Sequence, residues 1–201
     1  RPLARLIMAS DDPDGLYIVD PVAETERFVP LPTYPTSVSV GPAGTHAAVG
    51  HDGWLSHVRL TDGVVLETYP VATDVGDVVL AGNGYAYTVT GDDYGADELR
   101  SLNLTTGVET PAGGFNIYAG SRARLHPSGN FLYHSSPPNY SPSDVSKWDI
   151  RSGTAEFLYD SPYHGEFEGC GDLWMSDDGL RIFTRCGVAF HSSTVSANDL
   201  I

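Results

Sequence analysis

The chain has 201 residues, 41% of them hydrophobic, and a formal net charge of −15 at pH 7. The excess of acid argues against DNA, RNA or an anionic membrane as a partner, because phosphate binding requires clustered Lys and Arg. We interpret the negative charge as a feature that keeps the protein soluble or, alternatively, as one that binds cations. No apolar run approaches the roughly 18 residues of a membrane span, so no membrane insertion is expected. The chain opens at Arg1 with no signal peptide, which favours a mature or excised fragment.

Alternating apolar runs, separated by Pro and Gly turns, predict short β-strands along the whole chain. The first three strands are expected over 3–9, 16–21 and 27–32. Three fuller sets follow within 36–72, 76–112 and 120–160, and a last incomplete set falls within 168–201. The chain needs no helix and shows no linker, so we treat 1–201 as one domain.

Two sets of hairpin turns alternate along the chain with one common period. They are centred on Gly44, Gly84, Gly129 and Gly179, and on Gly63, Gly107 and Gly153. Two interleaved turns in a repeat of roughly 40–50 residues imply four strands per repeat, which is typical of a β-propeller blade. We therefore predict an all-β fold, a β-propeller of four-stranded antiparallel blades with about 4.5–5 blades present.

The strand count raises the question of how the ring closes. The partial blade 1–32 lacks an inner strand, and the last blade lacks a clear outer one. Either the two pack directly into a five-bladed ring, or the chain belongs to a larger ring, which we favour. An unclosed seam leaves strand edges exposed, so self-association through it is expected. The inner strands are expected to bury Val38, Val40, Val78, Leu80, Leu125, Leu173 and Met175.

The first full blade, "PTSVSVGPAGTHAAVGHDGWLSHVRLTDGVVLETYPV", resembles the YVTN-type propeller repeat of bacterial and archaeal surface proteins. The shared features are an apolar inner strand, a P-x-G turn, an apolar-x-V-G second strand and an L-T-x-G turn. "KWDI" at 147–150 is similar to the WD dipeptide of WD-repeat blades, but it occurs once. The resemblance implies a secreted or cell-surface binding scaffold, with an extracellular or periplasmic location.

The predicted connections differ between the two ends of the blades. Turns between strands one and two and between strands three and four are short, whereas the other connections are long and varied. Functional residues concentrate on loops that a rigid scaffold holds. The long loops carry aromatic residues among carboxylates, which we interpret as a candidate ligand-binding face: Tyr34, Trp54, Tyr94, Tyr118, Tyr140, Tyr163 and His164. Alternatively, the tyrosines fill gaps between blades.

Two acidic loops are weak candidates for Ca²⁺, which prefers six to eight oxygen ligands. They contain Asp12 and Asp14 in one loop and Asp92 and Asp93 in the other. Neither loop matches the D-x-[DN]-x-[DN]-G pattern, so no cofactor is expected. The seven His residues show no metal-ligand spacing.

The leading functional hypothesis is a non-catalytic module that binds a protein or carbohydrate through the long loops. The alternative is a propeller-based enzyme of the lactonase, lyase or glycosidase type, with acid/base residues near the central channel. His164, Glu166 and Glu168 are the residues considered for that role, and no catalytic motif supports them. A third reading is a structural ring segment without a ligand.

The two cysteines, Cys170 and Cys186, fall in one predicted hairpin. With a three-residue loop at 177–179, they would face each other directly across the strand ladder, roughly 4.5 Å apart at Cα. We predict a disulfide, which implies an oxidising compartment. The alternative is two buried free thiols in a cytosolic protein.

Overall fold

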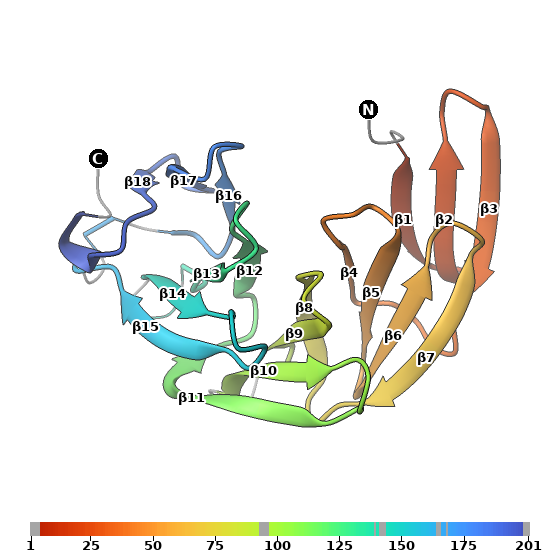
Figure 1. Ribbon diagram of the computed structural model, residues 1–201, viewed down its shortest axis with the longest axis horizontal. Coiled ribbons are helices and arrows are strands. Elements are labelled where there is room, and N and C mark those ends of the chain that lie inside the picture. Colours follow the sequence, from red (N-terminus) through yellow and green to blue (C-terminus); the bar gives the residue numbers. More distant parts are fainter. Residues whose placement is uncertain are drawn as a thin grey trace.

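The computed structural model describes residues 5–92, 97–138, 140, 144–163, 166–167 and 169–198. Within these residues the chain forms 18 strands in five antiparallel sheets, together with one short 3₁₀ turn, η1 (Ser196–Asn198). We number the sheets blades 1 to 5 in chain order. Figure 1 shows the blades standing around a common centre, with β4, β8, β12 and β16 nearest to it. The predicted all-β class and its repeated antiparallel blades are confirmed.

Each blade is a meander in which consecutive strands are hydrogen-bonded. Blade 1 contains β1 (Leu6–Asp11), β2 (Asp14–Asp20) and β3 (Thr25–Pro30). Blade 2 contains β4 (Ser37–Val40), β5 (His46–His51), β6 (Trp54–Arg59) and β7 (Val64–Pro70). Blade 3 contains β8 (Val75–Leu80), β9 (Tyr85–Thr90), β10 (Asp97–Asn103) and β11 (Glu109–Ile117). Blade 4 contains β12 (Arg122–Leu125), β13 (Phe131–Ser135), β14 (Val145–Asp149) and β15 (Glu156–Asp160). Blade 5 contains β16 (Leu173–Met175), β17 (Arg181–Thr184) and β18 (Ala189–His191).

The turn lengths identify which strand blade 1 lacks. The β1–β2 turn joins the paired residues Asp11 and Asp14, and the β5–β6 turn of blade 2 joins His51 and Trp54 across the same interval. The following turn of blade 1 also matches its counterpart in blade 2. β1, β2 and β3 are therefore the second, third and outer strands, and the described part of blade 1 has no inner strand.

The core lies between the blades rather than inside any one of them. Alternate residues of β5 contribute to two different clusters, because successive side chains of a strand point to opposite faces. Ala47 and Val49 pack against blade 1, where Leu16 and Ile18 are buried, whereas Ala48 packs against blade 3. A strand that packs against a blade on each face is apolar at successive positions, as β5 is at Ala47, Ala48 and Val49.

The blades form an arc that is not closed. Figure 1 shows blades 1 and 5 on either side of an opening, and no strand pairing joins them among the described residues. Both terminal faces are apolar. On blade 1, Leu6 is 54% exposed and Met8 lies beside it on the same face. On blade 5, the paired residues Trp174 and Phe183 are exposed.

The predicted core of the inner strands is confirmed in part. Val78, Leu80 and Leu173 are buried, and Val38, Leu125 and Met175 are half-buried. Val40 is 43% exposed, so its predicted burial was wrong. Val38 and Val40 share the face of β4 that is turned towards blade 1, as the packing of Val38 shows. That face is only partly covered, because the described part of blade 1 has no inner strand there.

The outer strand of blade 3 is longer than the sequence indicated. We expected a weak strand and then a loop over 113–121, but β11 continues to Ile117, which is fully buried opposite Asp97. The pairing shifts register between Asp97 and Leu99, and Gly114 adopts φ 101°. The irregular ladder turns Ile117 inward, where it packs against blade 4. This packing stabilises the end of β11, whose residues have a low intrinsic preference for a strand.

His134, in β13, is fully buried, and neither ring nitrogen has a hydrogen-bond partner among the described residues. Burial lowers its pKa to about 3. Below its ordinary pKa of about 6.5, the unfolded chain binds a proton that the folded chain refuses, so stability falls as pH falls from 6.5 towards 3. We expect His134 to remove about 1.4 kcal/mol of unfolding free energy between pH 7.5 and 5.5.

The measurement is urea denaturation at both pH values for the wild type and for His134→Leu. The variant is expected to lose that part of the pH dependence. His191→Leu is the matched control, because it makes the same substitution at a histidine that is exposed. Equal pH dependence in the wild type and His134→Leu would contradict the assignment.

Candidate functional site: the long-loop face

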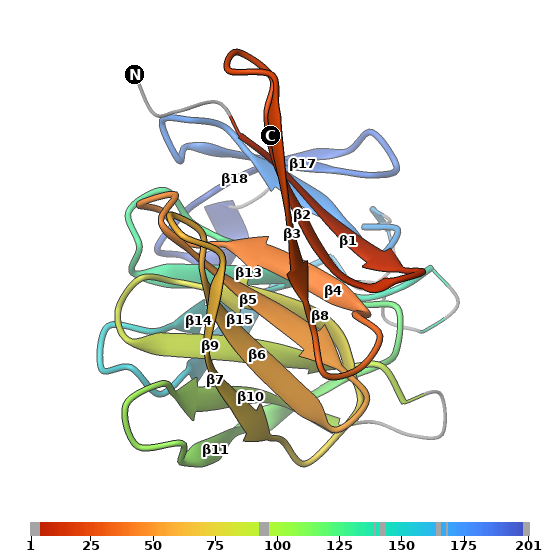
Figure 2. The ribbon, with the colours of Figure 1, turned by 90° about the vertical axis from the view of Figure 1, so that its right-hand side faces the viewer.

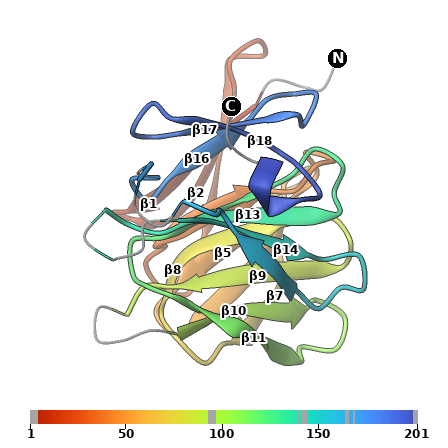
Figure 3. The ribbon, with the colours of Figure 1, turned by 90° about the vertical axis from the view of Figure 1, so that its left-hand side faces the viewer.

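In an antiparallel meander, successive connections lie at opposite ends of the strands. The loops between second and third strands therefore share one end of the arc with the connections from one blade to the next. We call this end the long-loop face. Figure 2 shows blades 1 and 2 from outside the arc, and Figure 3 shows blades 4 and 5 from the other side. In both views the connections project beyond the strands at the two ends of the blades.

Tyr34 lies in the β3–β4 connection and is exposed. Its hydroxyl donates to Asp52 Oδ1 over 3.5 Å, and the charge of Asp52 raises the pKa of Tyr34. The buried His51 holds this loop, because its Nδ1 donates to the Tyr34 carbonyl over 3.0 Å. Burial lowers the pKa of His51, so the ring is neutral and Nε2 accepts from Ser56 Oγ over 2.9 Å. Trp54 begins β6 and is also exposed.

Tyr118 and Tyr140 form an aromatic stack on the same face. Their ring centroids are 4.4 Å apart and the planes are inclined by 16°. Tyr118 belongs to the β11–β12 connection and Tyr140 to the β13–β14 loop, so two adjacent blades build the stack. Beside it lies a cavity of about 440 Å³, with Phe115 and Ser136 in its lining. Phe115 stacks in turn on Phe157 at 5.0 Å, which anchors the cavity to the core.

The structure does not gather all the predicted aromatic residues into one cluster. Tyr163 makes an edge contact with Phe167, at 5.3 Å between centroids, and Phe167 packs against the core between blades 4 and 5. This supports the gap-filling alternative for Tyr163. Tyr94 and His164 lie outside the described residues. Among the described residues of the predicted set, Tyr118 and Tyr140 are the two whose rings lie in direct contact.

The acidic residues that were considered as Ca²⁺ ligands do not form a metal site in the described part of the chain. Asp12 and Asp92 are exposed and Asp14 is half-buried, whereas Asp93 lies outside the described residues. In the described part of the chain, no three His, Cys, Asp or Glu residues gather as a metal site would require. Of the residues considered for acid/base chemistry, Glu166 is exposed, and Glu168, like His164, is not described. Of the described helical residues, no stretch is long and apolar enough to cross a membrane.

Cys170 and Cys186 form a disulfide, with Cα atoms 5.5 Å apart. The predicted ladder position was wrong, however. Leu173 pairs with Thr184, which shifts the register by one residue, and both cysteines lie beyond the ends of β16 and β17. Cys170 adopts φ 59° in a turn. The bridge therefore ties the β15–β16 connection to the β17–β18 loop, and both belong to the long-loop face.

Near the centre of the arc, charged residues of three blades join in a chain that the sequence analysis missed. Arg124 binds Asp77 at 3.0 Å and Asp172 at 2.7 Å. Asp77 also accepts from the Ala123 amide at 2.9 Å, and burial raises its pKa against the opposing effect of Arg124. The only sequence signal was the charge on inner strands otherwise predicted to be apolar. The three side chains link blades 3, 4 and 5 beside a cavity of about 450 Å³.

Comparison with protein-family models and with curated protein sequences finds no match. Among solved structures, Kuenenia stuttgartiensis hydrazine synthase is similar with a TM-score of 0.73 and 16% identity, over 94% of this chain and 52% of that chain. The β-propeller domain of Myceliophteria thermophila Cps50 (Swd1) has a TM-score of 0.71 and 16% identity, over 100% of this chain and 65% of that chain. A functionally unknown protein from Desulfotomaculum acetoxidans DSM 771 has a TM-score of 0.71 and 16% identity, over 96% of this chain and 63% of that chain.

The chain is a β-propeller arc of four-stranded and three-stranded blades. This follows from the five blades around one centre and from the similarity of the whole chain to a β-propeller domain. The chain spans between 52% and 65% of the length of these three structures. At such identities the similarity concerns the fold alone, and no family model supports the resemblance of blade 2 to the YVTN-type repeat.

Proposed function

We propose that the chain is a non-catalytic β-propeller module that binds a protein partner through the long-loop face, in an oxidising compartment at the cell surface or outside the cell. The observation that carries the proposal is the Tyr118–Tyr140 stack beside the Phe115 cavity. Tyrosine is enriched in protein interfaces, because its ring buries a large area while its hydroxyl stays hydrogen-bonded. The disulfide at the same face supports the oxidising compartment.

A carbohydrate is the second ligand class for this face, since aromatic rings also stack on sugars. The enzyme alternative needs an acid/base group near the central channel that is free to act. Among the described residues there, Asp77 and Asp172 are both bound by Arg124. This favours binding over catalysis. Self-association through the exposed faces of blades 1 and 5 stays a prediction.

The test places a photo-crosslinking residue at position 118 or 140 and exposes the protein to the extracellular protein fraction of its source organism. We expect one specific adduct, which unlabelled wild-type protein competes away. A Tyr118→Ala/Tyr140→Ala competitor should be at least about 30-fold weaker, as expected for the loss of interface hot spots. Circular dichroism checks that this variant is folded.

The matched control is a crosslinker at Val108, which is exposed in the β10–β11 turn at the opposite end of blade 3. An adduct of equal yield at Val108, or equal competition by the double variant, would refute the long-loop face as the binding surface. Binding of the wild type to a glycan array, without a protein adduct, would replace the protein partner by a carbohydrate.

A further inference from the structure

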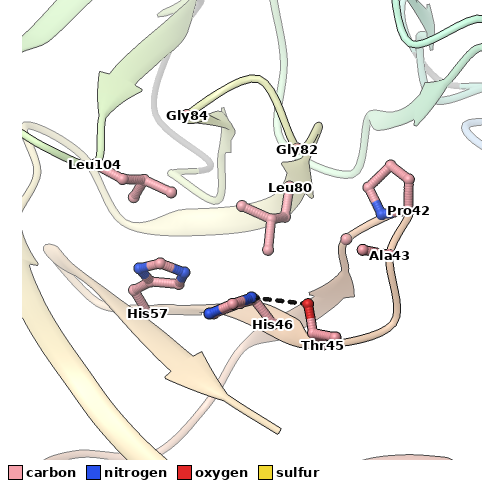
Figure 4. Close-up of a pocket in the computed structure, with 10 residues that line it drawn as sticks. Pro42, Ala43, Thr45, His46, His57, Leu80, Gly82, Gly84 and Leu104 are labelled. Atoms are coloured by element: carbon pink, nitrogen blue, oxygen red, sulfur yellow. Dashed lines mark hydrogen bonds between the residues drawn. The ribbon is translucent and has the colours of Figure 1, made fainter.

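A third pocket lies between blades 2 and 3, at the end of the arc opposite to the long-loop face. Its volume is about 230 Å³. His46, from the start of β5, and His57, from β6, form one side, and Leu80 and Leu104 of blade 3 lie across from them (Figure 4). The pocket is independent of the proposed partner surface, and the function proposed above makes no use of it.

The strand register explains why the two histidines meet. His46 pairs with Arg59, and Ala48 pairs with His57, so His46 and His57 are diagonal neighbours on one face of the sheet. The imidazole centroids are 5.2 Å apart, and the planes are inclined by 38°. Both side chains are half-buried, which keeps them accessible from the pocket.

Hydrogen bonding leaves nitrogen atoms available in this pocket. The Nδ1 atom of His46 lies 3.0 Å from Thr45 Oγ1, the dashed contact of Figure 4. When Nδ1–H donates to that hydroxyl, the lone pair of Nε2 is free, which is the arrangement of metal-ligating histidines. No described residue hydrogen-bonds to the His57 ring in the structure.

We propose that His46 and His57 together bind a divalent transition-metal ion, with Zn²⁺ as the reference ion. A Zn–N bond of about 2.0 Å puts each ring centre about 3.2 Å from the ion, and a tetrahedral angle then separates the centres by about 5.2 Å. The observed centroid distance is 5.2 Å. Neutral imidazole suits Zn²⁺, Cu²⁺ and Ni²⁺, whereas Ca²⁺ and Mg²⁺ require oxygen ligands that this pocket does not concentrate.

Water occupies the remaining coordination positions, because the described residues offer no third His, Cys, Asp or Glu ligand at this pocket. The site therefore binds with moderate affinity, and its open positions are accessible to an external ligand. Thr45 is a positioning residue, since it touches the His46 ring and not the ion. Its hydroxyl selects the tautomer and the ring orientation that leave Nε2 free.

The experiment is a calorimetric titration of the tag-free protein with Zn²⁺ at pH 7.5. We expect one ion per chain, with a dissociation constant on the order of 10 µM. His46→Gln and His57→Gln should each weaken binding at least tenfold. Thr45→Val should weaken it by up to about tenfold, which is the lower end of the effect of removing an orienting partner. The exposed His191 supplies the control, and His191→Gln should bind as the wild type does.

A second measurement does not depend on the folding of the variants. Electron paramagnetic resonance of the wild type with one equivalent of Cu²⁺ should report two coordinated imidazole nitrogens. A spectrum with one nitrogen or none would overturn the proposal. So would the absence of Zn²⁺ binding below millimolar concentration, or equal weakening by His191→Gln, which would assign the binding to scattered surface histidines.

Discussion

Replacing Trp148 with Ala is expected to lower the free energy of unfolding by about 3–5 kcal/mol. Trp148 is fully buried in β14, where it belongs to the cluster between blades 3 and 4. Phe115 and Phe157 contact its ring edge-on, with centroids at 6.4 and 5.2 Å. Truncation removes the apolar area of the indole and leaves a cavity that two blades cannot collapse to fill. Urea denaturation measures the change.

Trp174→Ala provides the matched control for this prediction. Trp174 is 51% exposed on the terminal face of blade 5, so its truncation should change stability by no more than about 0.5 kcal/mol in the isolated chain. Equal destabilisation by the two substitutions would contradict the position of the core between the blades. A large loss at Trp174 alone would instead show that a partner or a second copy covers the terminal face.

Removing the disulfide is expected to cost about 3 kcal/mol of unfolding free energy. The Cys170→Ser/Cys186→Ser variant loses a link between residues separated by 16 positions. In the chain-entropy account the bridge acts by restricting the unfolded chain. The consequence is large here because blade 5 has only three short strands in the described part of the chain. Urea denaturation without reductant compares the variant with the wild type.

Two controls separate the bridge from other effects of the substitutions. Reductant should bring the wild type to the stability of the double variant, and should leave the double variant unchanged. Thiol titration of the denatured, unreduced wild type should find no free thiol. Two free thiols would refute both the bridge and the oxidising compartment that we propose from it.

Much of the fold follows from local patterns. Period-two alternation marks the strands, and the turns follow from glycines such as Gly129 and Gly179, which adopt φ 72°. That the described part of blade 1 begins with a second strand was also predictable, because the order of turn types repeats from blade to blade. The cysteine pairing was predicted within one hairpin, where the two residues are close in sequence. The one-residue register error arose because the sequence does not specify how many residues the turn contains.

The candidate sites were predictable only in part. Residue type and loop length pointed to Tyr118 and Tyr140, since long loops with aromatic residues favour a binding surface. Their stacking was not predictable, because it depends on how closely blades 3 and 4 approach each other. His46 and His57 gave no recognisable spacing, since ligands on paired strands are related by register rather than by a fixed interval in the sequence.

The sequence by itself determined the strands, the repeat, the antiparallel blades and the two cysteines that pair, because each of these depends on contacts between residues near in the chain. Only the tertiary structure decided that Arg124 bridges Asp77 and Asp172 across three blades, and that the terminal faces of the open arc are apolar. These features arise from packing between blades. A repeat of roughly 40–50 residues brings such groups together only after the blades have stacked, so no local pattern records them.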